Sequence, residues 1–498
     1  MHESIPTGDP KINIRRGGAG HGFTNQTRVL KYSKVQTFSV SILGCRVNHY
    51  EAEQIAQVLR SWGLQQVEQG GDIRVVHTCS VTSQAAKGSR QQIRRATRLN
   101  VLQPIQVSGS SLEDHLDGRA KVIVTGCWAT SDRSTAEQIP GVDAVITHHE
   151  DVHQRLCELL ERWSGKNPVR RASNRVGTTS LPLLHDPQSA HQRAFIKVQD
   201  GCDAHCTYCI IPRLRPRLWS KNIEDTVHEA QALVNSGHKE IVLTGIFLGA
   251  YGQPTALRRR QPESTSKPLS RLIETLCTRV NGLERLRLSS MEPGDLDKHL
   301  INVIKRYPQV VPHFHLPLQA GSDRVLRKMN RQYTQSDFLD MISMVKESFD
   351  RPALTTDIIC GFPGETETDF EQTLHVVDQT GFIHIHAFPY SPRPQTAAAR
   401  WQREFVTPDV VNQRIRILQD RAQAYSLEFR KSFLDQIVTV LVERDQNRSD
   451  FRPGFRHGRT ERYFEVHFET SRPVQTGALV PIRVESITPG RTYGRVLE

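Results

Sequence analysis

Six short apolar segments, each followed by a segment of helical periodicity, recur between residues 195 and 388 and constrain the fold more than any other feature. The predicted strands are residues 195–198, 240–244, 284–289, 313–318, 354–359 and 382–388. Helical patterns at 223–235, 269–280, 336–348 and 367–379 lie in the gaps between them. Strands that alternate with helices form a parallel sheet, because each crossover helix returns the chain to the same end of the sheet. The six units therefore predict an α/β fold with a barrel or a partial (βα)6 barrel.

The segments on either side of this barrel have different patterns. Strands at 37–43, 73–78 and 121–125 alternate with helices at 51–62, 87–98 and 151–163, which predicts an N-terminal parallel α/β sheet. Residues 434–498 alternate with a period of two between Gly and Pro turns, which predicts a small all-β module. The predicted parts are a basic disordered leader at 1–34, an N-terminal domain at 35–165 with a polar surface insert at 99–118, a linker at 166–192, the barrel at 193–430 and the β-module at 432–498.

Charge and hydropathy restrict the partners of the chain. Its 498 residues include 65 Lys and Arg against 53 Asp and Glu, a surplus of +12 that favours a polyanion such as nucleic acid, with a basic surface of no function as the alternative. The longest apolar runs are one strand long, and residues 1–34 have no apolar segment of the kind found in signal peptides. We therefore expect no membrane partner and a cytoplasmic location.

A tight cysteine motif follows the first strand of the barrel. Cys202, Cys206 and Cys209 have the spacing C-x3-C-x2-C at a strand end, where active sites of α/β barrels gather. Thiolates are the ligands of iron–sulfur clusters, and three of them leave one iron of a four-iron cluster open to a small ligand. The alternatives are a zinc site, which usually has four protein ligands, and three incidental thiols.

A second group of cysteines belongs to the N-terminal sheet. Cys45, Cys79 and Cys127 each follow a predicted strand directly, so all three lie at one edge of the sheet and could converge on one site. A single cysteine near a strand end is more often a buried thiol, but three in equivalent positions favour a shared ligand. The remaining cysteines, Cys157, Cys277 and Cys360, are predicted to be packing thiols.

The barrel segment resembles the radical S-adenosylmethionine (SAM) superfamily, in which the open iron binds SAM. The resemblance implies a partial (βα)6 barrel and places Tyr208 against the adenine end of SAM. Gly245 falls in the loop that faces the methionine amino group. Ser289, Gln319 and the loop at 361–365 fall where the ribose and carboxylate contacts are expected.

With the N-terminal cysteines added, residues 36–498 resemble the methylthiotransferase family. The resemblance implies two [4Fe–4S] clusters, one held by Cys202, Cys206 and Cys209 and one by Cys45, Cys79 and Cys127. It implies that the first cluster reduces SAM to a radical that removes hydrogen from the substrate, and that the second supplies sulfur, with an electron donor such as flavodoxin or ferredoxin. The β-module would be a TRAM domain that binds tRNA, and its arginines and aromatics (Arg444, Arg452, Arg456, Arg459 and Arg462; Phe451, Phe455, Tyr463 and Phe464) suit that role.

The first motif distinguishes branches of that family. Leu43-Gly44-Cys45-Arg46-Val47-Asn48 is most similar to the branch that acts on N6-threonylcarbamoyladenosine in tRNA, next to the anticodon. The isopentenyladenosine branch typically has Gly-Cys-Gln-Met-Asn there, and the branch that modifies a ribosomal-protein aspartate has Gly-Cys-Pro-Lys-Asn. These two substrates, and a non-catalytic iron–sulfur RNA-binding protein, are the alternatives.

Two departures from the family pattern touch no proposed ligand. Residues 213–217 read Arg-Leu-Arg-Pro-Arg where Tyr-Ala-Arg-Gly-Arg is usual, and a proline in place of glycine fixes φ and removes a hydrogen-bond donor. His49 stands where glutamine is common.

Overall fold

The computed structural model describes residues 35–98, 119–164, 181–184, 192–258, 267–444, 454–470 and 473–497. The predicted leader at 1–34, the insert at 99–118 and most of the predicted linker at 166–192 lie outside these residues. Lys34–Glu498 form one compact unit, so the domain boundaries given above stay a prediction.

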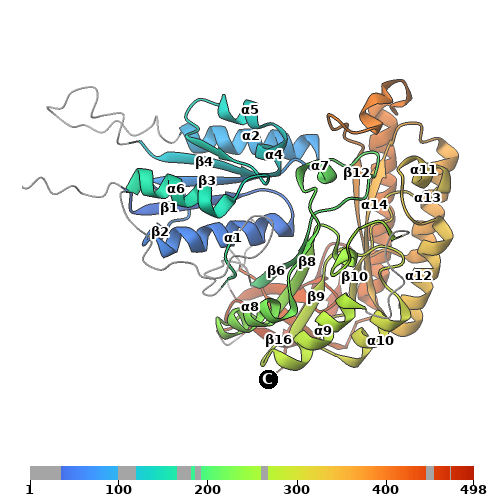
Figure 1. The fold of residues 1–498 in the computed structure, drawn as a ribbon. Coiled ribbons are helices and arrows are strands. Elements are labelled where there is room, and N and C mark those ends of the chain that lie inside the picture. Colours follow the sequence, from blue (N-terminus) through green and yellow to red (C-terminus); the bar gives the residue numbers. More distant parts are fainter. Residues whose placement is uncertain are drawn as a thin grey trace, which may run out of the picture. The chain divides into compact units, whose positions relative to one another are not determined.

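The N-terminal segment forms a parallel five-stranded sheet in the order β2-β1-β3-β4-β5. Its strands are β1 (Thr37–Ile42), β2 (Gln65–Gln66), β3 (Ile73–Thr78), β4 (Lys121–Gly126) and β5 (Ala144–Ile146). Helices α1 (Arg46–Ser61) and α6 (Val152–Ser164) pack on one face, and α2 (Ser83–Arg98), α4 (Cys127–Ser131) and α5 (Arg133–Glu137) pack on the other (Figure 1). The parallel sheet was predicted, whereas the short strands β2 and β5 were not.

The central segment contains six parallel strands in two sheets. β6 (Arg193–Asp200), β8 (Glu240–Gly245) and β9 (Arg285–Leu288) form one sheet, and β10 (His313–His315), β11 (Ala353–Cys360) and β12 (His384–Pro389) form the other. A bridge between Leu286 and Val310 joins the two sheets. Helices lie outside them: α8 (Ile223–Asn235), α9 (Pro268–Arg279), α10 (Lys298–Arg306), α11 (Asp323–Lys328), α12 (Gln335–Ser348) and α13 (Glu367–Thr380) (Figure 1). The predicted partial (βα)6 barrel is confirmed.

The two faces of these strands carry different side chains: the face under the helices is apolar, and the inner face is largely polar and charged. Ala194, Ile196, Ile241, Leu243, Leu286 and Leu288 belong to the main apolar core beneath the helices. Because side chains alternate along a strand, the residues between them point to the inner face of the barrel. Those inner residues include Arg193, Phe195, Lys197, Gln199, Glu240, Val242, Thr244, Arg285, Arg287 and Ser289. The interior is therefore polar and carries several cations.

Two local differences from the predicted strands have physical causes. β10 is only three residues long, because Pro317 has no N–H to donate and Gln319 has a left-handed φ of 61°. β7 (Trp219–Ser220) was not predicted, and it pairs antiparallel with the end of β6 after the short helix α7 (Ile211–Leu214).

The C-terminal segment is a small closed β-barrel, as predicted. Helix α14 (Pro408–Lys431) leads into strands that close in the order β13-β14-β15-β17-β16. Their bounds are β13 (Ile437–Val442), β14 (Phe455–Thr460), β15 (Glu465–Glu469), β16 (Leu479–Ile487) and β17 (Thr492–Val496). Its core contains Val438, Val440, Val466, Phe468 and Ile482.

Buried arginines join this small barrel to the central strands. Arg287 donates to the backbone oxygen of Glu461 at 3.1 Å, and Arg193 pairs with Glu443 at 2.6 Å. Both arginines also bind the buried carboxylate of Glu240, at 2.8 and 2.9 Å. Burial alone would raise the pKa of Glu240, but Arg287 and Arg193 outweigh it and lower that pKa to about 2.

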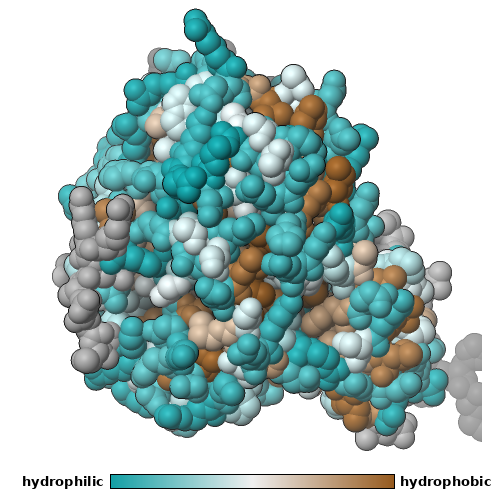
Figure 2. All heavy atoms as spheres, turned by 90° about the vertical axis from the view of Figure 1, so that its right-hand side faces the viewer, coloured by the Kyte–Doolittle hydropathy of each residue, from teal (hydrophilic) through white to brown (hydrophobic). Residues whose placement is uncertain are grey.

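No helix in the described ranges is long and apolar enough to cross a membrane. The face in Figure 2 is mostly hydrophilic, with apolar atoms in short stretches between polar ones. Among the described residues, the exposed large apolar side chains are Val81, Phe405, Leu434 and Ile437. The last two are neighbours at the start of the C-terminal barrel.

The lowered pKa of Glu240 predicts an acid-sensitive contribution to stability. A carboxyl whose pKa is depressed on folding stabilises the native state above its unfolded pKa, and the contribution is lost as pH falls toward the folded pKa. We expect the difference in unfolding free energy between the wild type and Glu240→Gln to shrink by about 2 kcal/mol between pH 6 and pH 3. Urea titrations across this range measure it. Glu284→Gln, which alters an exposed ion pair with Lys239, is the control and should show no such pH dependence. A constant difference for Glu240→Gln would contradict the assignment.

Candidate functional site

The first group of cysteines lies in the loop that follows β6. Gly201 begins this loop with a φ of 77°, and a Cβ there would lie 1.9 Å from the backbone oxygen of Arg217, so only glycine fits. Cys202, Cys206 and Cys209 then line one cavity of about 120 Å³, together with Tyr208, Ile246, Phe247, Glu292 and Arg331. The structure thus brings together the three cysteines and the aromatic residue that the sequence indicated.

Arg331 supplies a positive charge to this cavity and was not predicted. Its Nη1 donates to Cys206 Sγ at 3.3 Å and to the Tyr208 hydroxyl at 3.4 Å, and its Nη2 pairs with Glu292. Burial raises the pKa of Cys202 and of Cys209 to about 12, while Arg331 opposes the rise at Cys209. The sequence does not link Arg331 to the cysteine motif, because Arg331 lies far along the chain, in the segment after α11.

Gln199 was also not predicted from the sequence, although its side chain contacts two loops at the open end of the barrel. Its Nε2 donates to the backbone oxygen of Gly201 at 2.7 Å, and its Oε1 accepts from the backbone N–H of Phe247 at 2.8 Å. A Cβ at Gly245 would lie 3.0 Å from the Cβ of Gln199, so a larger residue would press on this contact. Gln199 therefore connects the loops that follow β6 and β8.

The predicted SAM contacts are at strand ends, but they do not all share the cysteine cavity. Gly245 ends β8 next to Ile246 and Phe247 of the cavity wall, and Ser289 follows β9 with a buried hydroxyl that has no hydrogen-bond partner. The cavity wall includes neither Ser289 nor Gln319. In the loop at 361–365, Glu365 accepts from the Gly361 N–H at 2.7 Å and pairs with Arg414 at 2.7 Å. That carboxylate holds its own loop in place.

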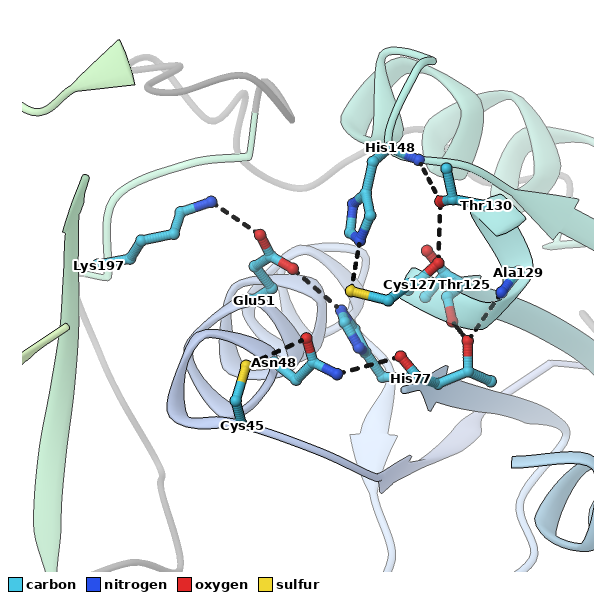
Figure 3. Close-up of polar contacts among 12 residues, drawn as sticks. Cys45, Asn48, Glu51, His77, Thr125, Cys127, Ala129, Thr130, His148 and Lys197 are labelled. Carbon is cyan, nitrogen blue, oxygen red and sulfur yellow. Dashed lines mark hydrogen bonds and ion pairs between the residues drawn. The ribbon is translucent and has the colours of Figure 1, made fainter. Parts of the chain in front are cut away.

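The second group of cysteines lies at one edge of the N-terminal sheet, where Figure 3 shows Cys45 and Cys127. Cys45 is the N-cap of α1, Cys79 follows β3 and Cys127 begins α4 directly after β4. β1, β3 and β4 are neighbours in the sheet, so their ends place the three thiols together. Gly126 makes the turn with a φ of 97°, and a Cβ there would lie 2.4 Å from the Thr78 oxygen.

The three thiols are close enough to affect one another. Burial, with smaller contributions from Cys45 and Cys79, raises the pKa of Cys127 to about 12 although the charge of Arg215 opposes the rise. Asn48 supports the group from α1: its Nδ2 donates to the Leu43 oxygen at 2.7 Å and to the Thr78 oxygen at 3.1 Å. The predicted convergence of these cysteines is therefore present in the fold.

His148 lies beside Cys127 and stays neutral. Its Nε2 is 3.8 Å from Cys127 Sγ (Figure 3). The same nitrogen accepts from Arg215 Nη2 at 2.9 Å. Burial and the charge of Arg215 lower the pKa of His148 to about 3, so the ring is uncharged at neutral pH.

A buried ion network connects the two cysteine groups. Arg215 pairs with both oxygens of Glu51 at 2.8 Å and with Asp200 at 2.9 Å. Lys197 pairs with Glu51 and with Asp200, each at 2.8 Å. All four side chains are at most 3% exposed. Glu51 belongs to α1, which starts after Cys45, and Asp200 ends β6 just before Cys202. Arg215 follows the cysteine loop, and its backbone oxygen accepts from the Cys202 N–H at 3.1 Å.

The unusual loop at 213–217 is thus part of this network. Pro216 does not displace Arg215, whose two terminal nitrogens both make hydrogen bonds. Arg213 and Arg217 border a surface hollow of about 480 Å³ beside His148 and His149. His49 packs its ring 5.9 Å from that of Phe195. Cys277 and Cys360 lie in the apolar core and Cys157 packs beside the N-terminal core, as predicted.

The chain matches two family models and several curated proteins over most of its length. Residues 37–147 match the uncharacterized protein family UPF0004, and residues 196–377 match the radical SAM superfamily. Threonylcarbamoyladenosine tRNA methylthiotransferase MtaB of Bacillus subtilis is 34% identical over 90% of this chain and 93% of its own. The protein of the same name from Thermotoga maritima is 33% identical over 82% and 87%. A tRNA-2-methylthio-N(6)-dimethylallyladenosine synthase of Parafrankia sp. is 34% identical over 90% and 86%.

A solved structure shares the fold. The radical SAM methyltransferase TsrM from Kitasatospora setae has a TM-score of 0.50 and 14% identity, covering 74% of each chain. Fold and sequence together define a radical SAM enzyme with an additional N-terminal domain. The chain belongs to the methylthiotransferase family, a group of transferases. Relatives named for different nucleosides match this chain at similar identity, so overall identity does not distinguish between these substrates.

The ion network predicts that replacing two arginines of one loop changes the unfolding free energy by very different amounts. Arg215→Met leaves Glu51 and Asp200 buried with Lys197 alone, and breaking a buried network in this way costs about 3–5 kcal/mol. Arg213→Met changes an exposed side chain whose hydrogen bond to Gln395 is 3.3 Å long, and should alter the unfolding free energy by less than about 0.5 kcal/mol. Urea unfolding of the two variants at pH 7 measures both values. Equal effects would show that the network does not contribute as described.

Proposed function

We propose that this enzyme transfers a methylthio group to C2 of N6-threonylcarbamoyladenosine in tRNA, next to the anticodon. The observation that carries the proposal is the placement of three thiols at each of two sheet edges, joined by one buried ion network. The curated relatives named as threonylcarbamoyladenosine tRNA methylthiotransferases support the choice of reaction. Methylthio transfer to isopentenyladenosine is the alternative, supported by relatives named for the dimethylallyl derivative.

Each cysteine group fits a [4Fe–4S] cluster by the chemistry of its donors. Cys202, Cys206 and Cys209 would hold one cluster and leave an iron open for SAM, and Cys45, Cys79 and Cys127 would hold the other. The Arg331 contact to Cys206 Sγ suits a thiolate, and the unpartnered Ser289 hydroxyl suits a polar ligand in the barrel. When bound, the clusters and SAM supply the electron, the radical and the sulfur.

The chain's own residues position and shield these groups. Tyr208 presents its ring to the cavity at the expected adenine end of SAM, and Gly245 keeps the opposite loop free of a side chain. Gln199 fixes the loops after β6 and β8 relative to each other, and Gln319 and Ser289 remain our candidates for SAM contacts. The electron would come from a donor such as flavodoxin or ferredoxin, and the enzyme would work in the cytoplasm.

Two of the five arginines that the sequence suggested for tRNA contact other residues of the protein, and Arg452 lies outside the described residues. Arg459 stacks on Tyr463 and lies near Glu443 and Glu465, and Arg462 donates to the Arg351 oxygen at 2.9 Å. Those side chains are occupied within the protein. Arg483 and Arg495 are instead exposed neighbours in the register of β16 and β17, and we assign phosphate contacts to them. The ion pair of Arg495 with Glu485 is exposed and therefore weak.

Cysteine variants test the reaction and both ligand sets. A strain that lacks the gene is complemented with wild type, Cys79→Ala, Cys206→Ala or Cys157→Ala, and its tRNA nucleosides are measured by mass spectrometry. Wild type and the control Cys157→Ala should restore the methylthio derivative of N6-threonylcarbamoyladenosine, and the other two should not. Purified Cys79→Ala and Cys206→Ala should each bind about four irons, against about eight in the wild type. Full iron content in either variant would contradict its ligand assignment, and a methylthio group on isopentenyladenosine alone would favour the alternative.

Salt dependence tests the tRNA contacts. Each neutralised phosphate releases counterions, so log affinity falls with log salt concentration by about 0.9 per contact. The double variant Arg483→Gln, Arg495→Gln should bind tRNA more weakly and lower this slope by about two. Filter binding over a range of salt concentrations measures it. Arg306→Gln, on the outer helix α10 with its side chain 65% exposed, is the matched control. An unchanged slope in the double variant would remove these arginines from the interface.

A further inference from the structure

A small cavity inside the barrel is bordered by three arginines. Its volume is about 70 Å³, and its walls are Arg46, Gln192, Arg193, Phe195, Val242, Arg287 and Tyr463. Phe195, Val242 and Arg287 lie on the inner face of the strands, beneath the mouth that carries Cys202. Arg46 reaches the cavity from the start of α1, one residue after Cys45. The cavity therefore lies on the inner face of the barrel, beside the residue that follows the second cysteine group.

The positive charges of this cavity are not fully compensated. Arg287 binds Glu240, and Arg193 binds Glu240 and Glu443. One terminal nitrogen of Arg193, Nη2, is nevertheless buried without a hydrogen-bond partner. Arg46 makes no hydrogen bond or ion pair with any residue that the structure describes. Burial lowers the pKa of Arg46, and the charges of Arg287 and Arg193 lower it further, while Tyr463 and Glu240 oppose the fall. On balance the charged form of Arg46 is disfavoured in this place.

Tyr463 closes the cavity from the C-terminal barrel. It has a φ of 71°, which is rare for a residue with a side chain, and its ring lies 4.8 Å from the Arg287 guanidinium and 5.2 Å from that of Arg193. Such rings stabilise cations and exclude water without neutralising the charge. The ring thus holds two of the cavity's arginines without neutralising them, which leaves the cavity positively charged.

We infer that this cavity binds the carboxylate of the threonyl group of N6-threonylcarbamoyladenosine, with Arg46 and Arg193 Nη2 as its donors. This inference rests on the proposed function and assigns substrate selectivity to Arg46. A guanidinium pairs well with a carboxylate, and the pair is stronger in a site that excludes water. The isopentenyl group is uncharged and would leave Arg46 uncompensated. A cationic pocket therefore favours the threonylcarbamoyl substrate and disfavours its apolar counterpart.

The backbone phosphates of tRNA could present the same anionic chemistry, and the experiment separates the two sources. The reconstituted full-length enzyme is titrated with one tRNA in three forms, carrying N6-threonylcarbamoyladenosine, isopentenyladenosine or unmodified adenosine at the target position. The wild type should bind the first form about 10- to 100-fold more tightly than the third. Arg46→Gln should lose this preference and bind the other two forms as the wild type does. Arg46→Lys, which keeps the charge, should retain part of the preference, and Arg306→Gln should retain all of it.

Each remaining outcome has one meaning. An equal loss of affinity for all three tRNAs in Arg46→Gln would place a backbone phosphate in the cavity and overturn the inference. A wild type that methylthiolates the threonylcarbamoyl form, combined with an Arg46→Gln variant of unchanged preference, would also overturn it and leave the proposed function intact. A wild type without product on that form would refute the proposed function itself. Iron content is measured in every variant, and if it falls in Arg46→Gln, the comparison of Arg46→Lys with the wild type decides.

Discussion

The buried network of Glu51, Lys197, Asp200 and Arg215 determines how the two halves of the site are held. Each of its members is adjacent to a cysteine segment: Glu51 lies on the helix that starts after Cys45, and Asp200 ends the strand that leads to Cys202. Arg215 binds both carboxylates and also touches His148 beside Cys127. A shift of either cysteine group would therefore separate charges that are at most 3% exposed. The free-energy cost of separating these buried charges therefore fixes the position of one cysteine group relative to the other.

The network is better explained by the arrangement that it imposes on α1 and β6 than by a contribution to the free energy of unfolding. Replacing a buried ion group with well-packed apolar residues is often neutral or stabilising, whereas removing one member is expensive. Apolar side chains could hold α1 against β6, but they would tolerate small sliding movements. Two carboxylates shared by Lys197 and a bidentate Arg215 restrict such movement, because each hydrogen bond of the network has a preferred direction. For a reaction in which two cofactors must meet one substrate, that restriction is useful.

The sequence predicted what depends on local patterns and missed what depends on contacts between distant residues. Strand periodicity located the six barrel strands, and the position of Cys45, Cys79 and Cys127 after strands predicted that they share an edge. Helix α1 starts at Arg46, five residues before the predicted helix, because Cys45 serves as its N-cap and the helix leads straight out of the cysteine turn. Arg331, Gln199 and Arg215 could not be found in this way, since nothing in a single sequence relates an arginine after α11 to a cysteine after β6. The arginines of the C-terminal barrel were predicted for RNA, but Arg459 contacts Glu443 and Tyr463 within that barrel, and Arg462 contacts the backbone at Arg351.

A buried arginine lies beside each cysteine group, where it can offset the charge that the thiols acquire on binding a cluster. Burial and the neighbouring thiols raise the pKa of Cys127, Cys202 and Cys209 to about 12, so these three are neutral thiols at neutral pH in the free protein, and binding of a metal cluster requires them to release protons. The resulting thiolates add negative charge in places that water does not screen. Each group has a buried guanidinium nearby that is fixed by carboxylates of its own: Arg331 with Glu292, and Arg215 with Glu51 and Asp200. Because those carboxylates already balance much of the arginine charge, each guanidinium stabilises thiolates moderately and remains stable in their absence. Arg46 differs from both, since no carboxylate among the described residues forms an ion pair with it, and Glu240 makes only a small electrostatic contribution. In our proposal the substrate carboxylate supplies the missing partner.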